Sequence, residues 1–195
     1  MVLPDPVVQA HQRASELGFG LSCENEVGVL LAALSAATPL GGRVVELGTG
    51  VGVGLSWIIV GLGARTDVQV HSVEHDPQVA RAAASANWPD YVTLHAEDVL
   101  ACLPSLGAFD LIFADAQGGK TEGLELTLAA LAPGGQLLVD DMTLRPKDEL
   151  QVSLWPLLES VRQRLTTDPR LQTAELDCAT GLILTTKRHQ RPPPG

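Results

Sequence analysis

Hydrophobic and polar positions alternate between two spacings through most of this chain. From about residue 43 onward, short continuous apolar runs are followed by stretches in which apolar residues recur every three or four positions. Short apolar runs are typical of buried parallel strands, and the wider spacing is typical of the helices that connect them. The runs predicted as strands are 44–47, 68–73, 91–95, 109–114 and 136–139. This alternation predicts an α/β fold.

Helical spacing precedes the first run and separates the later ones. The predicted helices are 6–17, 24–37, one that starts at 55, 77–87, one that starts at 99, 122–131 and 150–166. Two last apolar runs, 172–176 and 182–185, flank Thr180-Gly181, which predicts an antiparallel hairpin. We therefore predict a Rossmann-like, doubly wound, seven-stranded sheet that is mostly parallel, with a C-terminal antiparallel hairpin and helices on both faces.

The length of 195 residues suits one domain with a sizeable core. We assign 43–188 to the core and treat 1–42 as N-terminal helices of the same domain that cover the site. Residues 189–195 are expected to form a flexible tail. Within the second helix, Gly28 costs about 1 kcal/mol relative to alanine, so either close packing or a ligand needs the space, or a glycine near a helix start is simply tolerated.

A loop with a glycine at every second position follows the first predicted strand. Glu46 precedes Gly48, Gly50 and Gly52, and helical spacing resumes at Leu55. Glycine lacks a Cβ, so the backbone can turn sharply there and lie against a ligand. The G-x-G-x-x-G spacing of dinucleotide folds needs a third glycine at position 53 or 55, where valine and leucine stand. The loop predicts a bound small molecule, and the carboxylate favours a cationic or amine-bearing one over a pyrophosphate.

This strand, acid and glycine loop together resemble the first motif of the class I S-adenosylmethionine-dependent methyltransferases. The resemblance implies that Glu46 lies near the methionyl part of S-adenosylmethionine (SAM). It also implies that the loop binds this cofactor through Gly48, Thr49, Gly50 and Gly52. The alternative is a glycine-rich loop that only lets the helix pack against the strand.

Acidic residues stand at or just past the ends of the predicted parallel strands. They are Glu46, Glu74, Asp98, Asp115, Asp140 and Asp141. Because the carboxyl ends of the strands of an open parallel sheet face one crevice, these side chains are expected to converge. Carboxylates packed together raise one another's pKa, so a cation, a hydrogen-bond donor or a positively charged ligand is expected among them. SAM carries both a sulfonium and an ammonium group.

Two of these acids are candidates for the nucleoside part of the cofactor. Glu74 lies at the end of the second strand, where a carboxylate can accept hydrogen bonds from both hydroxyls of a ribose. The alternative for Glu74 is a favourable charge at the start of the next helix. Asp98 resembles the superfamily acid that accepts from the adenine amino group, although Glu97 could do the same, and either acid could simply cap the helix that starts at Val99.

Asp115, Asp140 and Asp141 can present oxygen ligands to a divalent ion such as Mg²⁺. With Lys120 they resemble the cation-dependent O-methyltransferases of the catechol and caffeoyl-CoA type. That family holds its metal with an Asp after the fourth strand and an Asp-Asn pair after the fifth, and a Lys shortly after the first Asp acts as base. The resemblance implies that Asp115 and Lys120 are catalytic.

The chain departs from that pattern at two places. The usual Asp-Ala-Asp-Lys becomes Asp-Ala-Gln-Gly-Gly-Lys over 115–120, which moves Lys120 by two residues, and Asp141 replaces the Asn. The alternative to a metal site is that Asp115 and Asp140 cap their strands while Asp141 contacts the substrate directly.

Net charge and cysteine content indicate which classes of binding partner and which cellular compartment the sequence favours. A formal net charge of -10 argues against a nucleic-acid substrate. The 3 cysteines are widely spaced and contain no C-x-x-C, which predicts neither a disulfide frame nor a zinc site and fits a reducing cytoplasm. No stretch approaches the length of a membrane span. Homodimerisation through the N-terminal helices or the terminal hairpin is an open expectation.

The sequence as a whole favours a SAM-dependent methyltransferase that methylates an oxygen of a small hydroxylated acceptor, with a divalent cation such as Mg²⁺ as an optional assistant. An N-methyltransferase of a small amine and a nucleotide-binding protein without catalysis remain the alternatives. An NAD-dependent oxidoreductase would share the sheet and the ribose acid, but it requires the third glycine that this loop lacks.

Overall fold

Alternation of buried side chains along the central strands explains how the sheet is covered. In the computed structural model, which describes residues 2–147 and 149–189, Val44 packs on one face of the sheet and Val45 on the other. Because side chains alternate along a strand, a strand that is apolar at both positions can be buried on both faces. The strands are β1 (Arg43–Leu47), β2 (Gln69–Val73), β3 (Val92–His95), β4 (Phe109–Ala114), β5 (Leu131–Val139), β6 (Leu171–Leu176) and β7 (Leu182–Lys187).

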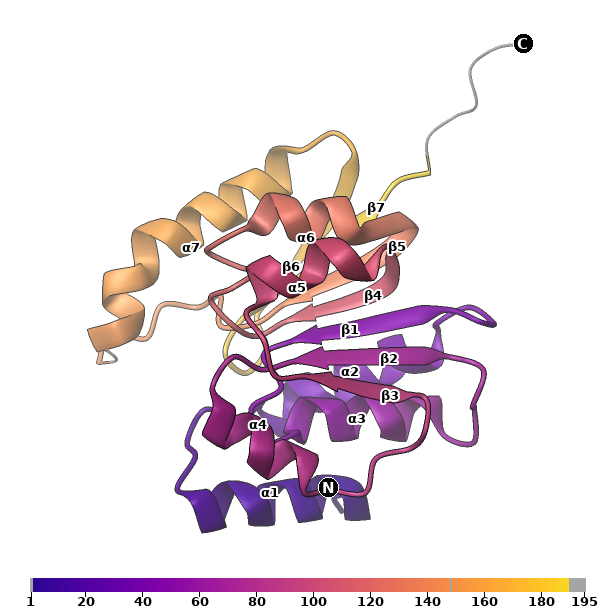
Figure 1. Cartoon of the computed structure of the whole chain (residues 1–195). Helices are drawn as coiled ribbons and strands as arrows, with labels where there is room; N and C mark the ends of the chain where they lie inside the picture. Colours follow the sequence, from indigo (N-terminus) through magenta and orange to yellow (C-terminus); the bar gives the residue numbers. More distant parts are fainter. Residues whose placement is uncertain (1, 148, 190–195) are drawn as a thin grey trace.

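The seven strands form one sheet in the order β3-β2-β1-β4-β5-β7-β6 (Figure 1). The first five pair in parallel, whereas β7 is antiparallel to both β5 and β6. The mostly parallel sheet and its C-terminal antiparallel hairpin confirm the predicted fold class. The strand order reverses between β1 and β4, and a crevice that can receive a ligand is expected at such a reversal.

Helices cover both faces of this sheet (Figure 1). They are α1 (Asp5–Leu17), α2 (Asn25–Ala36), α3 (Val53–Leu62), α4 (Pro77–Ala84), α5 (Val99–Leu106), α6 (Leu124–Ala130) and α7 (Glu149–Thr167). Buried side chains of α1, α2 and α3 form one apolar layer with the sheet, and those of α5, α6 and α7 form the other. Within the described residues, no helix is both long and apolar enough to cross a membrane.

Two predicted boundaries differ from the structure by more than two residues. The helix predicted at 122–131 ends at Ala130, and β5 already begins at Leu131 instead of at residue 136. The register between β4 and β5 shifts along the strand, because Phe109 pairs with Leu131 whereas Leu111 pairs with Gln136. The Pro-Gly-Gly segment at 133–135 is thus an irregularity within β5, and the pairing of β5 with β4 produces it. The other difference is α4, which ends at Ala84. Residues 190–195 of the predicted tail lie outside the described part of the chain.

Gly28 is a point of close approach between α2 and α3. A Cβ built on Gly28 would lie 2.1 Å from Nε1 of the buried Trp57. Real Cβ atoms do not approach other heavy atoms this closely, so the helix needs a residue without a side chain there. Of the explanations considered for Gly28, close packing is the one that the structure supports.

Replacing Gly28 with alanine should therefore lower the free energy of unfolding by about 1 to 3 kcal/mol through overpacking, although alanine has the higher helix propensity. Urea denaturation followed by circular dichroism measures this change. Gly20→Ala is the matched control, because nothing lies within 4 Å of a Cβ built on Gly20. Equal stability of both variants and the parent would contradict the packing explanation.

Candidate active site

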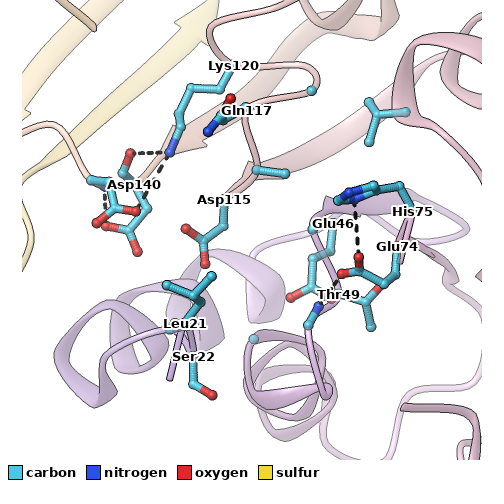
Figure 2. A pocket seen from close by; sticks show the side chains of 18 of the residues that line it. Leu21, Ser22, Glu46, Thr49, Glu74, His75, Asp115, Gln117, Lys120 and Asp140 are labelled. Carbon is cyan, nitrogen blue, oxygen red and sulfur yellow. Dashed lines mark hydrogen bonds and ion pairs between the residues drawn. The ribbon is translucent and has the colours of Figure 1, made fainter. Parts of the chain in front are cut away.

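A cavity of about 890 Å³ opens at the carboxyl ends of the parallel strands. The glycine loop after β1, the acidic ends of β2, β4 and β5, and the loop at 19–24 all contribute to its walls. Figure 2 shows Glu46 and Glu74 on one side and Asp115, Lys120 and Asp140 on the other. The strand ends therefore bring together the acids that the sequence places there.

The glycine loop is hydrogen-bonded to the end of β2, and its backbone conformation favours glycine. The N–H groups of Gly48 and Thr49 donate to the carbonyl of Val73 over 2.9 and 3.0 Å. Three of its glycines have positive φ angles, of 102° at Gly48, 54° at Gly50 and 93° at Gly52. Residues that carry a Cβ rarely adopt such angles. The loop thus has a defined conformation. Its glycines are needed both for their positive φ angles and because a Cβ would contact neighbouring residues.

Among the residues that the structure describes, no cationic side chain takes part in the hydrogen bonds of the buried acid Glu46. Its side chain is 1% exposed, and Ser72 donates its hydroxyl to Oε2 over 2.5 Å. Thr49 lies 2.6 Å from the Ser72 oxygen and completes the chain of hydroxyls. The pKa of Glu46 is raised to about 8, mainly by burial and also by the charge of Glu74, while the Ser72 hydrogen bond opposes the shift. A positively charged ligand in the cavity would favour the ionised form.

Glu74 is held by backbone groups on either side of it. The N–H of Gly50 donates to Oε2 and the N–H of Asp76 to Oε1, both over 2.9 Å. The side chain links the glycine loop to the start of α4, where Asp76 caps the helix. Glu74 therefore has a fixed orientation beside the cavity, while the helix cap itself is provided by Asp76.

Asp98 lines the cavity and also caps a helix. Its Oδ1 accepts from the N–H of Leu100 over 2.6 Å at the start of α5. Glu97 is exposed and does not contribute to the cavity wall. Of the two neighbouring acids, the structure brings Asp98 to the site, and its two candidate roles are compatible.

Asp115 and Asp140 face each other across the ends of two neighbouring strands. The N–H of Asp115 donates to Leu47 over 3.0 Å, and that of Asp140 donates to Ala114 over 3.1 Å. Burial, followed by the charge of Asp140, raises the pKa of Asp115 well above its usual range. Burial also raises the pKa of Asp140, although a hydrogen bond from Thr180 opposes this shift. Both carboxyl groups therefore require a nearby positive charge in order to ionise readily.

Lys120 supplies a positive charge despite its shift along the sequence. Its side chain is buried, with Nζ 3.1 Å from the carbonyl oxygen of Asp140 and 3.9 Å from Oδ2 of Asp141 (Figure 2). Asp141 also pairs with Arg145, whose Nη2 lies 3.0 Å from Oδ1. The expectation that Lys120 belongs to the site thus has a geometric basis.

The three expected metal ligands do not have the spacing of a coordination site. An ion held at about 2.1 Å leaves its opposite ligands about 4.2 Å apart. Among the described residues, the one trio of acidic, histidine or cysteine side chains whose ligand atoms all lie within 4.8 Å of one another is His95, Glu97 and Cys102. The expected trio lacks this spacing, and Arg145 is paired with one of its members. With Lys120 in place, the three carboxylates therefore do not have the spacing of a coordination site for a divalent ion.

Several residues in or next to the cavity wall were not expected from the sequence. Ser72 holds Glu46, Thr180 holds Asp140, and Cys23 lines the wall from the N-terminal loop. A serine within an apolar strand is a signal that could have marked Ser72. Thr180 and Cys23 reach the site through chain segments that are distant in the sequence, so no local pattern marks them.

The buried Glu46 carboxyl should make the cofactor-free protein less stable as the pH rises. Between about pH 4.5 and pH 8 the unfolded chain releases a proton that the folded protein keeps, so the free energy of unfolding falls across this window. Glu46→Gln removes this contribution. Its melting temperature should exceed that of the parent by roughly 10 °C at pH 8 and match it near pH 4.5, as measured by scanning calorimetry without cofactor. An identical pH dependence in both proteins would contradict the assigned shift.

Comparison with known proteins agrees with this arrangement. A family model described as a methyltransferase domain matches residues 45–142. A protein of Mycolicibacterium vanbaalenii, named as a predicted O-methyltransferase, is 33% identical over 147 residues, which are 68% of this chain and 61% of that protein. The tRNA1(Val) (adenine(37)-N6)-methyltransferase of Citrobacter koseri is 35% identical over 102 residues, which are 48% of this chain and 40% of that protein. The chain thus spans less than two thirds of the length of either relative.

A solved structure shares the whole fold. The O-methyltransferase TomG of Streptomyces achromogenes, determined in complex with SAM, aligns with a TM-score of 0.78 and 21% identity. The alignment covers 96% of this chain and 91% of TomG. The family model covers the glycine loop and every acidic strand end of the cavity, about half of the chain. The chain belongs to the methyltransferase domain family.

Proposed function

We propose that this protein transfers a methyl group from SAM to an oxygen of a small hydroxylated acceptor. The observation that carries the proposal is the pairing of Glu46 and Glu74 around the glycine loop at one end of a cavity whose other end holds Asp115 and Lys120. The end with Glu46 and Glu74 suits a cationic nucleoside. The end with Asp115 and Lys120 suits an acceptor hydroxyl that loses a proton. The names of the relatives, and the SAM bound to TomG, support this assignment.

The cavity offers contacts to SAM at four places. Gly48 and Gly50 leave their backbone open to a ligand, since neither carries a Cβ. Glu46 offers a buried carboxylate to the cationic amino-acid end. Glu74 offers a carboxylate that is already oriented by two N–H groups to the ribose hydroxyls. Asp98 lies further along the wall, where it can accept from the adenine amino group. Thr49 and Gly52 complete the loop.

The protein's part in the reaction is to position the acceptor and to take its proton. When bound, SAM supplies an electrophilic methyl group, and the new oxygen–carbon bond forms as the carbon–sulfur bond breaks. Asp115 lines the cavity, and the raised pKa of its carboxyl makes its ionised form a stronger base than an ordinary aspartate. Lys120 holds a positive charge beside it. Holding the reacting atoms at near-attack distance contributes several kcal/mol more.

Two assays test the function. Calorimetry with SAM, its demethylated product and NAD should give heat with the first two only. Incubation with labelled SAM and a panel of catechols, other hydroxylated acceptors and small amines should label an oxygen acceptor. Labelling only of amines would favour an N-methyltransferase, and binding without any labelling would favour a non-catalytic binding protein. With a net charge of -10, tRNA is not expected as a substrate and serves as the negative control.

Replacing Glu74 with alanine should weaken SAM binding at least tenfold, because a carboxylate hydrogen bond to a ligand contributes about 1.5 to 3 kcal/mol. The dissociation constant from calorimetry measures this loss. Glu97→Ala is the matched control, since Glu97 is an exposed acid outside the cavity wall. If Glu97→Ala weakened SAM binding and Glu74→Ala did not, the ribose assignment would be wrong.

Replacing Asp115 with asparagine should lower kcat by about 10²- to 10⁴-fold, because the side chain keeps its size but can no longer take a proton. SAM affinity should change far less than turnover. Single-turnover measurements at saturating SAM separate the two effects. Normal turnover by Asp115→Asn would remove this residue from the chemistry.

A further inference from the structure

The carboxylate cluster between β4 and β5 already contains a cation that belongs to the chain. Lys120 is 5% exposed, and its charge lowers the pKa of both Asp115 and Asp140. Its Nζ donates to the carbonyl of Asp140 and lies 3.9 Å from Asp141. A buried ammonium is costly unless charges and hydrogen bonds offset its burial, and this cluster supplies both.

Three of the six carboxylate oxygens that a divalent ion could use already have other partners. Oδ1 of Asp140 accepts from the N–H of Asp141 over 2.6 Å and from the hydroxyl of Thr180. Oδ1 of Asp141 pairs with Arg145, and its Oδ2 faces Lys120. Together with the spacing of the three carboxylates, these contacts leave the ammonium as the cation of the cluster.

A tight turn delivers Lys120 to this position. The carbonyl of Gln117 accepts from the N–H groups of Lys120, Thr121 and Glu122 over 3.0 to 3.1 Å. Gly119 has a φ of 85°, and a Cβ built there would lie 2.6 Å from Leu47. Gly119 is one of the two glycines that move Lys120 along the sequence. It therefore also allows the turn to fold back toward the strand ends.

We propose that the Lys120 ammonium takes the place of a divalent ion in this site, so that methyl transfer proceeds without metal and the ammonium stabilises the acceptor oxygen as its negative charge develops. The inference rests on the function proposed above. Lys120 keeps its proton throughout: the acceptor proton goes to Asp115, and one N–H of the ammonium remains on Asp140 while another faces the acceptor oxygen. Lys120 is thus a catalytic electrostatic group and not the base.

The first test uses the parent protein. Treatment with EDTA should leave turnover within about twofold, and added Mg²⁺ should not raise it. Titration with Mn²⁺, followed by electron paramagnetic resonance of the free ion, should show no stoichiometric binding. One tightly bound Mn²⁺ per chain, or loss of turnover in EDTA with recovery in Mg²⁺, would overturn the proposal.

The second test exchanges the cation. Lys120→Gln should lower kcat by about 10²-fold while the SAM dissociation constant stays within about twofold. Because the carboxylates then lack their cation, this variant should gain Mn²⁺ binding, which a merely structural lysine would not produce. Lys147→Gln is the control, since Lys147 is exposed and lies outside the cavity wall. Full activity of Lys120→Gln, or no gain of Mn²⁺ binding by a folded variant, would count against the proposal.

These outcomes separate the inference from the proposed function. A parent protein that binds SAM and methylates an acceptor only with Mg²⁺ retains the function and refutes the role of Lys120. A parent protein that binds no SAM refutes the function, and the Mn²⁺ titrations still decide whether Lys120 is the cation of the cluster. If circular dichroism shows Lys120→Gln to be unfolded, the EDTA and Mn²⁺ measurements on the parent protein decide the question alone.

Discussion

Negative charge enclosed at the carboxyl edge of the sheet is the constraint on which the rest of this site depends. Glu46, Asp115 and Asp140 each have a raised pKa, and burial is the largest cause for each. The protein offsets part of this cost with hydroxyls from Ser72 and Thr180 and with the ammonium of Lys120. A ligand with positive charge can offset more, and binding to the folded state alone stabilises it. The energetics of the fold and the choice of ligand are thus linked.

Strand order brings these charges together. The order of the strands reverses between β1 and β4, which pair in parallel. Their register places Leu47 opposite Ala114. The residues that follow these partners are Gly48, which starts the glycine loop, and Asp115. A Cβ built on Gly48 would lie 2.9 Å from Ala116, so the glycine loop and the segment that follows β4 are in direct contact. The glycine loop and Asp115 are adjacent in the cavity because of this pairing.

Unusual backbone geometry is concentrated around the same edge. Asp141 has a φ of 63°, one of two residues other than glycine with a positive φ in the described chain. Such conformations cost energy and persist only where the surroundings impose them, which is frequent at functional sites. Here the surroundings are the ion pair with Arg145 and the hydrogen bond from Met142 to Gly181, which holds the segment after β5 against the hairpin.

The sequence by itself determined the class of fold, the strands to within a few residues except at the start of β5, and the acids at their ends. These features depend on side-chain periodicity and turn residues, which act over a few neighbouring positions. Tertiary structure decided the early start of β5, the choice of Asp98 over Glu97 at the cavity wall, and the partners that Ser72 and Thr180 provide. It also decided that Lys120 reaches the carboxylates in spite of its displacement. Each of these depends on register and packing between segments far apart in the chain, and no local pattern records such contacts.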